Sequence, residues 1–222
     1  EQGLLKTRKK LGLFANIRPT FTFDSLVENS PLKKSKIDGT DLIFVRELTG
    51  GIYFGESGRK NNGESAFDTC EYNRDEIIRL AKKGFEIADK RKKKLCCVDK
   101  ANVLETSRLW RETIQEMEKD YPNIQVSYEL VDAVAMRLIQ SPKNYDVLIT
   151  ENLFGDILTD EASVISGSMG LMPSASISEV NSLYGPIHGS FPEATGKNIA
   201  NPLATILSAA MMLEMSFNFK LE

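Results

Sequence analysis

Short apolar runs alternate along the chain with longer segments in which apolar residues recur every three or four positions. The runs typical of strands span 41–48, 52–56, 94–98, 124–130 and 145–150. The segments with helical periodicity span 75–90, 106–119, 132–140 and 156–166. Because strand and helix signals alternate, the pattern predicts an α/β fold.

Local signals sharpen two of these elements. Asn73 stands where an N-cap residue is expected for the helix that follows, and that helix carries Ile77, Ala81 and Phe85 on one face. The segment 124–130 (IQVSYEL) alternates apolar and polar residues, as a half-buried strand does. The polar stretch 59–65 (RKNNGES) predicts a loop.

The composition changes after residue 166. Residues 167–202 are rich in Gly, Pro, Ser and Asn, with short strand candidates at 175–179 and 183–187. Asn201 and Pro202 then form the expected N-cap and first turn of an apolar helix, LATILSAAMMLEM. From composition, a domain boundary is expected near residue 166.

The overall composition excludes several classes of protein. The chain has 222 residues, is 41% hydrophobic and 27% charged, and has a net charge of −3, which gives no electrostatic reason to expect nucleic acid as a partner. No apolar run approaches the length of a membrane span. Cys70, Cys96 and Cys97 form no CxxC pair, so we expect reduced core cysteines of an intracellular protein, with a disulfide or a zinc site as the alternative.

Three aspartates follow two of the predicted strands. Asp132 comes directly after strand 124–130, and Asp156 and Asp160 follow strand 145–150 at a spacing that puts both on one helical face. Ligands bind at the carboxyl ends of strands in α/β sheets, so these carboxylates are candidate ligands for Mg²⁺ or Mn²⁺. The alternative is that Asp132 and Asp156 are acidic helix starts favoured by the helix dipole.

Three arginines form a second group of candidates. Arg8 and Arg18 lie ten residues apart, and Arg46 stands at the end of a predicted strand. Guanidinium groups bind carboxylates through two parallel hydrogen bonds, so three of them in one pocket would suit a small di- or tricarboxylate. Taken singly, each arginine is better explained as a surface ion pair.

Candidate acid–base residues come next. Lys100 lies just past strand 94–98, where a desolvated lysine beside a metal can act as a general base, although an exposed loop lysine fits the pattern too. Tyr53 is a candidate proton donor or a core residue of its predicted strand. The loop 188–202, which holds His188 and Glu193, is either a nucleotide-binding loop or an ordinary surface loop. The chain contains neither GxGxxG nor GxxxxGK[ST].

Six stretches, in this order, resemble the β-decarboxylating dehydrogenases of the isocitrate/isopropylmalate family, and the resemblance covers nearly the whole chain. They are LGLFANIRP, VRELTGGIYFGE, VDKANVLE, ENLFGDILTDEAS, GSMGLMPSAS and HGSFPEATGKNIANP. LTGGIYFGE is typical of the isopropylmalate branch. The resemblance implies a two-domain α/β fold that is not a Rossmann fold, with residues 1–13 and 167–222 in a partial nucleotide-binding domain. Residues 14–166 would form the second domain, for dimerisation and for metal and substrate binding.

The resemblance also implies roles for the candidate residues. Arg8, Arg18 and Arg46 would bind the carboxylates of 3-isopropylmalate, and Leu4 and Leu5 would face its isopropyl group. The implied catalytic pair is Tyr53 and Lys100, and the implied metal ligands are Asp132, Asp156 and Asp160. Lys100 and Asp132 would serve the partner subunit's site in a homodimer, where Asp132 would also contact substrate. The implied NAD-binding residues are His188, Gly189, Ser190, Glu193, Ala194, Ala200 and Asn201.

The implied activity is NAD-dependent oxidation and decarboxylation of 3-isopropylmalate in leucine biosynthesis. Glu193 would repel a 2′-phosphate and so favours NAD over NADP, while Gly185 stands where the family usually has a glutamate beside the nicotinamide. We expect a cytoplasmic location, or a plastid or mitochondrion in a eukaryote. Relative to the family we also expect the N-terminal quarter and the extreme C-terminus to be missing, which would leave the chain inactive by itself. The alternatives are an inactive, dimerising homologue and a dehydrogenase of another 2-hydroxy diacid.

Overall fold

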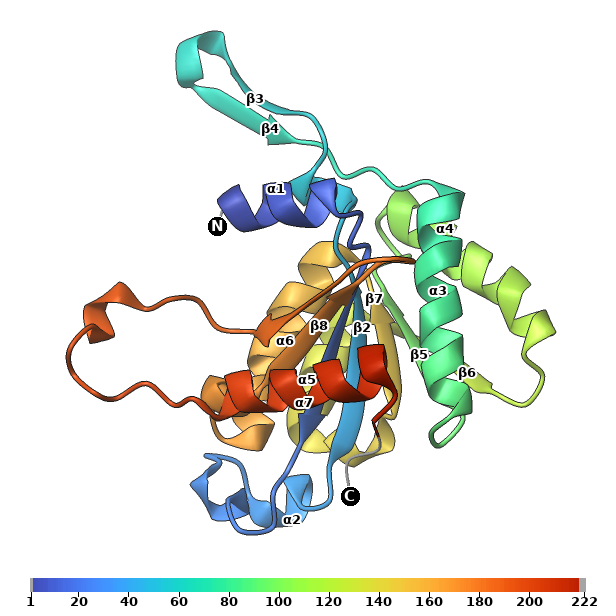
Figure 1. The fold of residues 1–222 in the computed structure, drawn as a ribbon. Helices are drawn as coiled ribbons and strands as arrows, with labels where there is room; N and C mark the ends of the chain where they lie inside the picture. The colour runs from blue at the N-terminus through green and yellow to red at the C-terminus, as the bar shows by residue number, and fades with distance from the viewer. Residues whose placement is uncertain (1, 220–222) are drawn as a thin grey trace.

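A seven-stranded mixed sheet forms the centre of the computed structural model, which describes residues 2–219 (Figure 1). Its strand order is β6-β5-β7-β2-β1-β8-β9. The strands are β1 Ala15–Phe21, β2 Asp41–Glu47, β5 Lys94–Asp99, β6 Gln125–Leu130, β7 Val147–Thr150, β8 Pro173–Ile177 and β9 Ser182–Pro186. Strands β2, β7, β5 and β6 are parallel, whereas β1 is antiparallel to both β2 and β8. The α/β prediction is confirmed.

Helices cover both faces of this sheet (Figure 1). The α-helices of residues 2–219 are α1 Gln2–Lys10, α2 Lys34–Ile37, α3 Arg74–Asp89, α4 Glu105–Met117, α5 Val131–Gln140, α6 Asn152–Ser166 and α7 Leu203–Phe217, of which α1 and α2 lie at the two ends of the sheet (Figure 1). One core cluster joins α3 and α4 to the sheet around Phe85 and Trp110, and a second joins α5 and α6 to the opposite face around Phe44 and Leu138. Strands β2, β5 and β7 are therefore buried on both sides, which explains their apolar sequences. The edge strand β6 is only partly buried and alternates as predicted.

The local sequence signals act as predicted in α3. Asn73 and Glu76 form a reciprocal capping box, in which each side chain accepts a hydrogen bond from the other's backbone N–H. Ile77, Ala81 and Phe85 are fully buried. The cysteines are free, with Cys96 and Cys97 buried in β5.

Two predicted elements are wrong. Residues 52–56 form no strand, because Gly51–Tyr53 is a 3-10 helix that begins at a glycine with a φ of 74°. The buried Glu47 carboxylate accepts hydrogen bonds from the backbone N–H groups of Thr49 and Gly50, and this turns the chain. The predicted polar loop at 59–65 belongs instead to a projecting hairpin of β3 Ser57–Lys60 and β4 Ser65–Asp68 (Figure 1).

The sheet runs through both of the domains predicted from sequence. Strand β1 lies in the predicted second domain, and it pairs with β8 of the predicted first domain between Ala15–Ile177 and Ile17–Ala175. The division at residues 13 and 166 therefore stays a prediction. Among the helices in the described part of the chain, none combines the length and the apolar character needed to cross a membrane.

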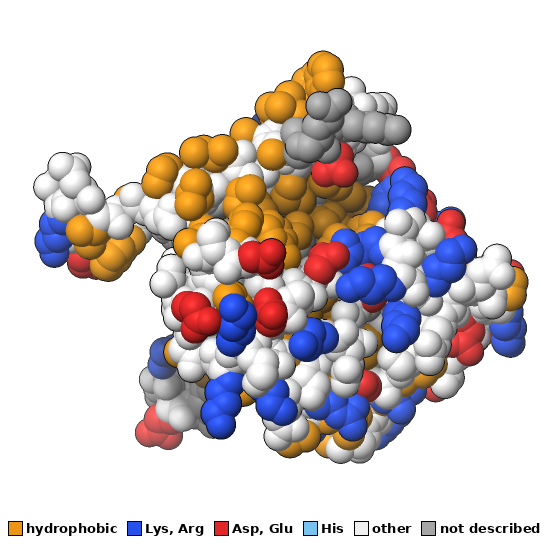
Figure 2. All heavy atoms as spheres, turned by 90° about the horizontal axis from the view of Figure 1, so that it is seen from below, with side chains coloured by type: hydrophobic (Ala, Val, Ile, Leu, Met, Phe, Trp, Pro, Cys, Tyr) orange, Lys and Arg blue, Asp and Glu red, His pale blue; other side chains and the backbone are white. Residues whose placement is uncertain are grey.

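Helix α7 covers β8 and β9 but leaves part of its apolar surface exposed. Figure 2 shows apolar side chains gathered in a hollowed region beside this helix. The exposed apolar residues of α7 are Leu203, Ile206, Leu213, Met215 and Phe217.

Candidate active site

A pocket of about 490 Å³ lies where α1, the middle of the sheet and the start of α6 meet. Arg18 comes from β1, Arg46 from β2 and Arg8 from the last turn of α1. The antiparallel register pairs Arg18 with Phe44 and Asn16 with Arg46, so the two arginines lie on neighbouring strands, two register positions apart. The remaining lining residues are Leu4, Leu5, Tyr53, Asp156, Ser174, Pro186, Ile187, His188 and Gly189.

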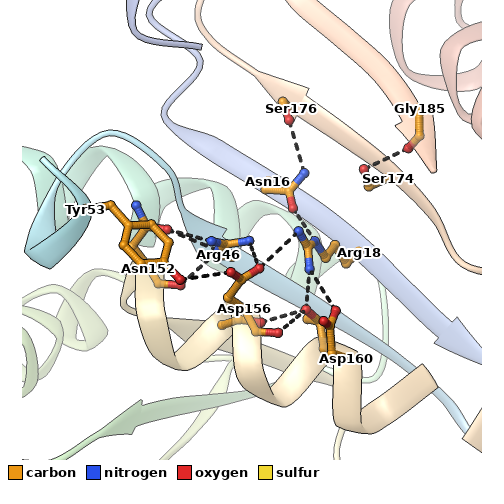
Figure 3. A network of polar contacts seen from close by, with 12 residues as sticks. Asn16, Arg18, Arg46, Tyr53, Asn152, Asp156, Asp160, Ser174, Ser176 and Gly185 are labelled. Carbon is orange, nitrogen blue, oxygen red and sulfur yellow. Dashed lines mark hydrogen bonds and ion pairs between the residues drawn. The ribbon is translucent and has the colours of Figure 1, made fainter. Parts of the chain in front are cut away.

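Arg46 is held in place from several directions (Figure 3). Its Nη1 donates to Asp156 Oδ1, and its Nη2 donates to Asn152 Oδ1 at 2.8 Å. Its Nε donates to the backbone carbonyl of Asn152 at 2.9 Å. The side chain is only 3% exposed. Burial lowers the pKa of Arg46, while the neighbouring Asp156 raises it.

Arg18 is equally buried and links β1 to α6. Its Nη1 donates to Thr159 Oγ1, and its Nε donates to Asn16 Oδ1. Its guanidinium lies 3.7 Å from Asp156 and 3.9 Å from Asp160. Burial, and then repulsion from Arg46, lower the pKa of Arg18 to about 9, so the group still carries its charge at neutral pH.

Arg8 has no such partners within residues 2–219. Its buried Nε has no hydrogen-bond acceptor among the described residues. Burial and the nearby Arg46 lower the pKa of Arg8, while Asp156 opposes that shift. Three guanidinium groups thus face the pocket against one lining carboxylate, Asp156. Because desolvated cations need opposite charge, this excess favours an anionic ligand.

Tyr53 faces the same pocket from the 3-10 helix after β2. Its hydroxyl donates to Asp156 Oδ2 at 2.9 Å, and its ring lies 5.9 Å from the Arg46 guanidinium carbon. Burial, together with the hydrogen bond to Asp156, raises the pKa of Tyr53. Tyr53 is 40% exposed rather than a core residue, so its hydroxyl can reach a ligand and stays protonated at neutral pH.

Asp156 and Asp160 lie on the pocket side of α6, one turn apart (Figure 3). Helix α6 begins at Asn152, four residues before Asp156, and its first turn holds no acidic residue. The interpretation of Asp156 as an acidic helix start is therefore wrong. Its carboxylate instead balances Arg46 and Arg18. Burial raises the pKa of Asp160, with Arg18 opposing that shift.

Asp132 and Lys100 lie apart from this pocket, which neither of them lines. Asp132 is in the first turn of α5, and its Oδ2 lies 2.9 Å from Lys100 Nζ. The hydrogen bond from Lys100 lowers the pKa of Asp132. Among residues 2–219, no group of three or more His, Cys, Asp or Glu side chains is placed to hold a metal ion. One chain therefore brings together two of the three predicted metal ligands.

Of the predicted cofactor-binding residues, only His188 and Gly189 line the pocket. The loop that follows them extends away from the sheet before returning to α7 (Figure 1). That loop carries Ser190, Glu193, Ala194 and Ala200, with Glu193 and Ala194 in the 3-10 helix Pro192–Ala194. Pro202, not Asn201, is the N-cap residue of α7, and the Oδ1 of Asn201 accepts from the Leu203 N–H at 3.0 Å. At Gly185 on β9, a Cβ atom would meet nothing within 4 Å.

Sequence reasoning missed some pocket residues. Ser174 on β8 and the short segment Pro186–Ile187 line the wall opposite α6. Their residue types carry no chemical signal, and only the pairing of β8 with β1 brings them to the site. Asn152, which holds Arg46 without lining the pocket, was missed too, although its place at the end of a predicted strand was a usable signal.

The fold and the pocket agree with a dehydrogenase family. The family described as isocitrate/isopropylmalate dehydrogenase matches residues 1–222, and the chain belongs to that family. A 3-isopropylmalate dehydrogenase of Bacteroides fragilis (strain YCH46) is 60% identical over 214 residues, which is 96% of this chain and 60% of the relative. The 3-isopropylmalate dehydrogenase of Aquifex aeolicus (strain VF5) is 53% identical over 221 residues, covering 98% of this chain and 61% of the relative.

A solved structure agrees with these matches. The isocitrate dehydrogenase from Methylococcus capsulatus superposes with a TM-score of 0.89 at 36% identity, covering 96% of this chain and 62% of that one. The chain thus spans about 60% of the length of the curated relatives it matches.

Proposed function

We propose that the protein containing this chain oxidises and decarboxylates 3-isopropylmalate to 4-methyl-2-oxopentanoate and CO₂ with NAD as the hydride acceptor. The observation that carries this proposal is the pocket in which Arg8, Arg18 and Arg46 converge beside Tyr53 and Asp156. A 2-hydroxy diacid supplies the two carboxylates that these cations lack. The relatives that match almost the whole chain are named for this substrate.

Leu4 and Leu5 support the choice of substrate. Both leucines lie on α1, one turn before Arg8, and both line the pocket. A branched alkyl group buried against them would be stabilised by about 0.8 kcal/mol per CH₂. A third carboxylate at the same place, as in isocitrate, would be desolvated against leucine without a cation, which costs free energy.

Tyr53 is the proton donor in this proposal. Its hydroxyl stays protonated and rests on Asp156 Oδ2, from which it can turn to a ligand carbon. Lys100 is proposed as the base that takes the substrate hydroxyl proton. Because Lys100 pairs with Asp132 outside this pocket, it would act in the site of a second copy of the chain. The homodimer is therefore part of the proposal.

The residues fit a divalent metal only in part. Asp156 and Asp160 offer hard oxygen donors, but both Asp156 oxygens already accept hydrogen bonds, from Arg46 and Tyr53. A metal here would take Asp132 of a second copy as its third carboxylate and would act as a Lewis acid toward the substrate oxygen. The chain's own residues hold the carboxylates and supply the proton.

The pocket wall made by β8, β9 and His188 fits the cofactor end of the site. It lies across the cavity from α6, with open space above Gly185. The long loop that carries Glu193 is proposed to close over NAD, with the Glu193 carboxylate disfavouring a 2′-phosphate.

The test is NADH formation by the purified product of the full open reading frame, with 3-isopropylmalate, NAD and Mn²⁺. Malate and isocitrate serve as matched substrates that lack the isopropyl group, and NADP serves as the matched cofactor. We expect turnover to be fastest with 3-isopropylmalate and NAD. Turnover restricted to isocitrate or to malate would show a different 2-hydroxy diacid as substrate. Absence of turnover with all three would favour the alternative of an inactive, dimerising homologue.

A further inference from the structure

Tyr72 and Asn152 lie behind the arginine pocket and line none of it. We propose that these two residues form a brace that positions Arg46 for the substrate carboxylate, so that they act on substrate affinity without touching the ligand. This inference rests on the proposed function and extends it to residues behind the site.

Asn152 provides most of the contacts that fix the Arg46 guanidinium. Its side-chain Oδ1 accepts from Arg46 Nη2 at 2.8 Å and from Nε at 3.2 Å, and its backbone carbonyl accepts from the same Nε at 2.9 Å. Its Nδ2 donates to the carbonyl of Gly50 at 3.1 Å. Asn152 is 1% exposed, so water does not replace these bonds. The amide thus ties Arg46 to the loop that carries Tyr53.

Tyr72 fixes Asn152 in turn. Its hydroxyl accepts from the backbone N–H of Asn152 at 3.0 Å, which satisfies an otherwise orphan donor at the start of α6. A Cβ atom at Gly51 would lie 2.2 Å from that hydroxyl, and one at Gly50 would lie 2.9 Å from the Tyr72 ring. The ring also packs edge-on against Trp110 at 5.4 Å. The two glycines are needed because this tyrosine occupies the space beside their backbone.

The hydrogen bonds of Arg46 affect how its guanidinium binds a ligand carboxylate. Arg46 Nη1 donates a hydrogen bond to Asp156, and Arg46 Nε and Nη2 donate to Asn152. The planar guanidinium is therefore locked in one plane before any ligand arrives. A preorganised guanidinium loses less conformational freedom when it binds a carboxylate, so loosening it weakens binding of the carboxylate more than it slows the chemical step.

The test compares Asn152→Ala and Tyr72→Phe with the wild-type protein in steady-state kinetics. We expect KM for 3-isopropylmalate to rise about tenfold to a hundredfold in Asn152→Ala, because hydrogen bonds to a charged group are removed. The rise should be smaller in Tyr72→Phe, which removes one hydrogen bond from a neutral backbone N–H. KM for NAD and kcat should change less. Tyr145→Phe is the matched control, since Tyr145 is also buried and its hydroxyl donates to Glu129 at 2.8 Å, away from the pocket.

A double-mutant cycle with Arg46→Lys separates positioning from a general loss of structure. If Asn152 acts through Arg46, adding Asn152→Ala to Arg46→Lys raises KM little further. Additive increases in KM, or an unchanged KM in both single variants, would overturn the inference while the active wild type still supports the proposed function. A wild-type protein without turnover would overturn the proposed function and the brace with it.

Discussion

Gly155 sets how closely α6 approaches the sheet, and this closeness determines whether Asp156 reaches Arg46. A Cβ atom on Gly155 would lie 2.3 Å from Thr150 Oγ1, 2.6 Å from Arg46 Cγ and 2.9 Å from Arg46 Cβ. All three distances are too short for real contacts, and the Cβ and Cγ atoms of Arg46 lie close to the backbone and cannot swing away. Gly155→Ala should therefore push α6 outward and displace Arg46.

Two opposing contributions determine how much Gly155→Ala changes the free energy of unfolding. Overpacking a tight interior site costs about 1–3 kcal/mol, while replacing a helical glycine by alanine stabilises a helix by about 1 kcal/mol. We expect Gly155→Ala to lower the free energy of unfolding by up to about 2 kcal/mol and to raise KM for 3-isopropylmalate. The measurements are urea denaturation and steady-state kinetics. Gly3→Ala is the matched control, because Gly3 is also helical but a Cβ there meets nothing within 4 Å, so the substitution should not destabilise the protein. A Gly155→Ala protein that is as stable as the wild type and has an unchanged KM would refute the steric reasoning.

Further predictions concern Gly185, Glu151 and Asp156. Gly185→Glu should change the free energy of unfolding by less than about 0.5 kcal/mol, because the new side chain enters open space. The same substitution should tighten NADH binding in a fluorescence titration. An unchanged affinity for NADH would argue against a cofactor at this wall of the pocket. Burial raises the pKa of Glu151 to about 7, above its ordinary 4.5. Between these two pH values the folded state holds a proton that the unfolded state has lost. The free energy of unfolding should therefore fall as the pH rises through this range. Glu151→Gln should remove up to about 3 kcal/mol of that fall in unfolding curves recorded across this range, and an unchanged pH dependence would contradict the assignment. Asp156→Ala should abolish Mn²⁺-dependent NADH formation and destabilise the fold, because Arg46 loses its carboxylate partner and Arg18 keeps only Asp160. Full turnover in this variant would rule out the proposed metal ligand.

The fold was predictable wherever local pattern and tertiary packing agree. Helix α3 is an example, because Asn73 and the spacing of Ile77, Ala81 and Phe85 specify its start and its buried face without reference to the rest of the chain. The segment after β2 was not predictable in this way. Its apolar residues indicate a strand, but the buried Glu47 carboxylate and the left-handed Gly51 turn the chain into a 3-10 helix.

Sequence pattern is limited in the same way at the site, because its residues lie far apart in the chain. Residue types alone identified Arg8, Arg18 and Arg46 as candidates for binding carboxylates, but only the register of β1 on β2 and the position of α1 bring them into one pocket. The side-chain contacts between Asp156 and Tyr53 join residues 103 positions apart. No periodicity in the sequence encodes such a contact. Lys100 and Asp132 remain predictions, because their proposed role needs a second copy of the chain.

Calorimetric titration with 3-isopropylmalate tests the central claim that the arginine pocket binds a 2-hydroxy diacid. Arg8→Ala is the most informative variant, because the Arg8 Nε has no acceptor among the described residues and the substitution breaks no ion pair between them. We predict saturable binding to the wild-type protein and an affinity at least about tenfold weaker in Arg8→Ala, as expected for one lost charge-assisted contact. Equal affinity in the two proteins, or no binding to the wild type, would contradict the account.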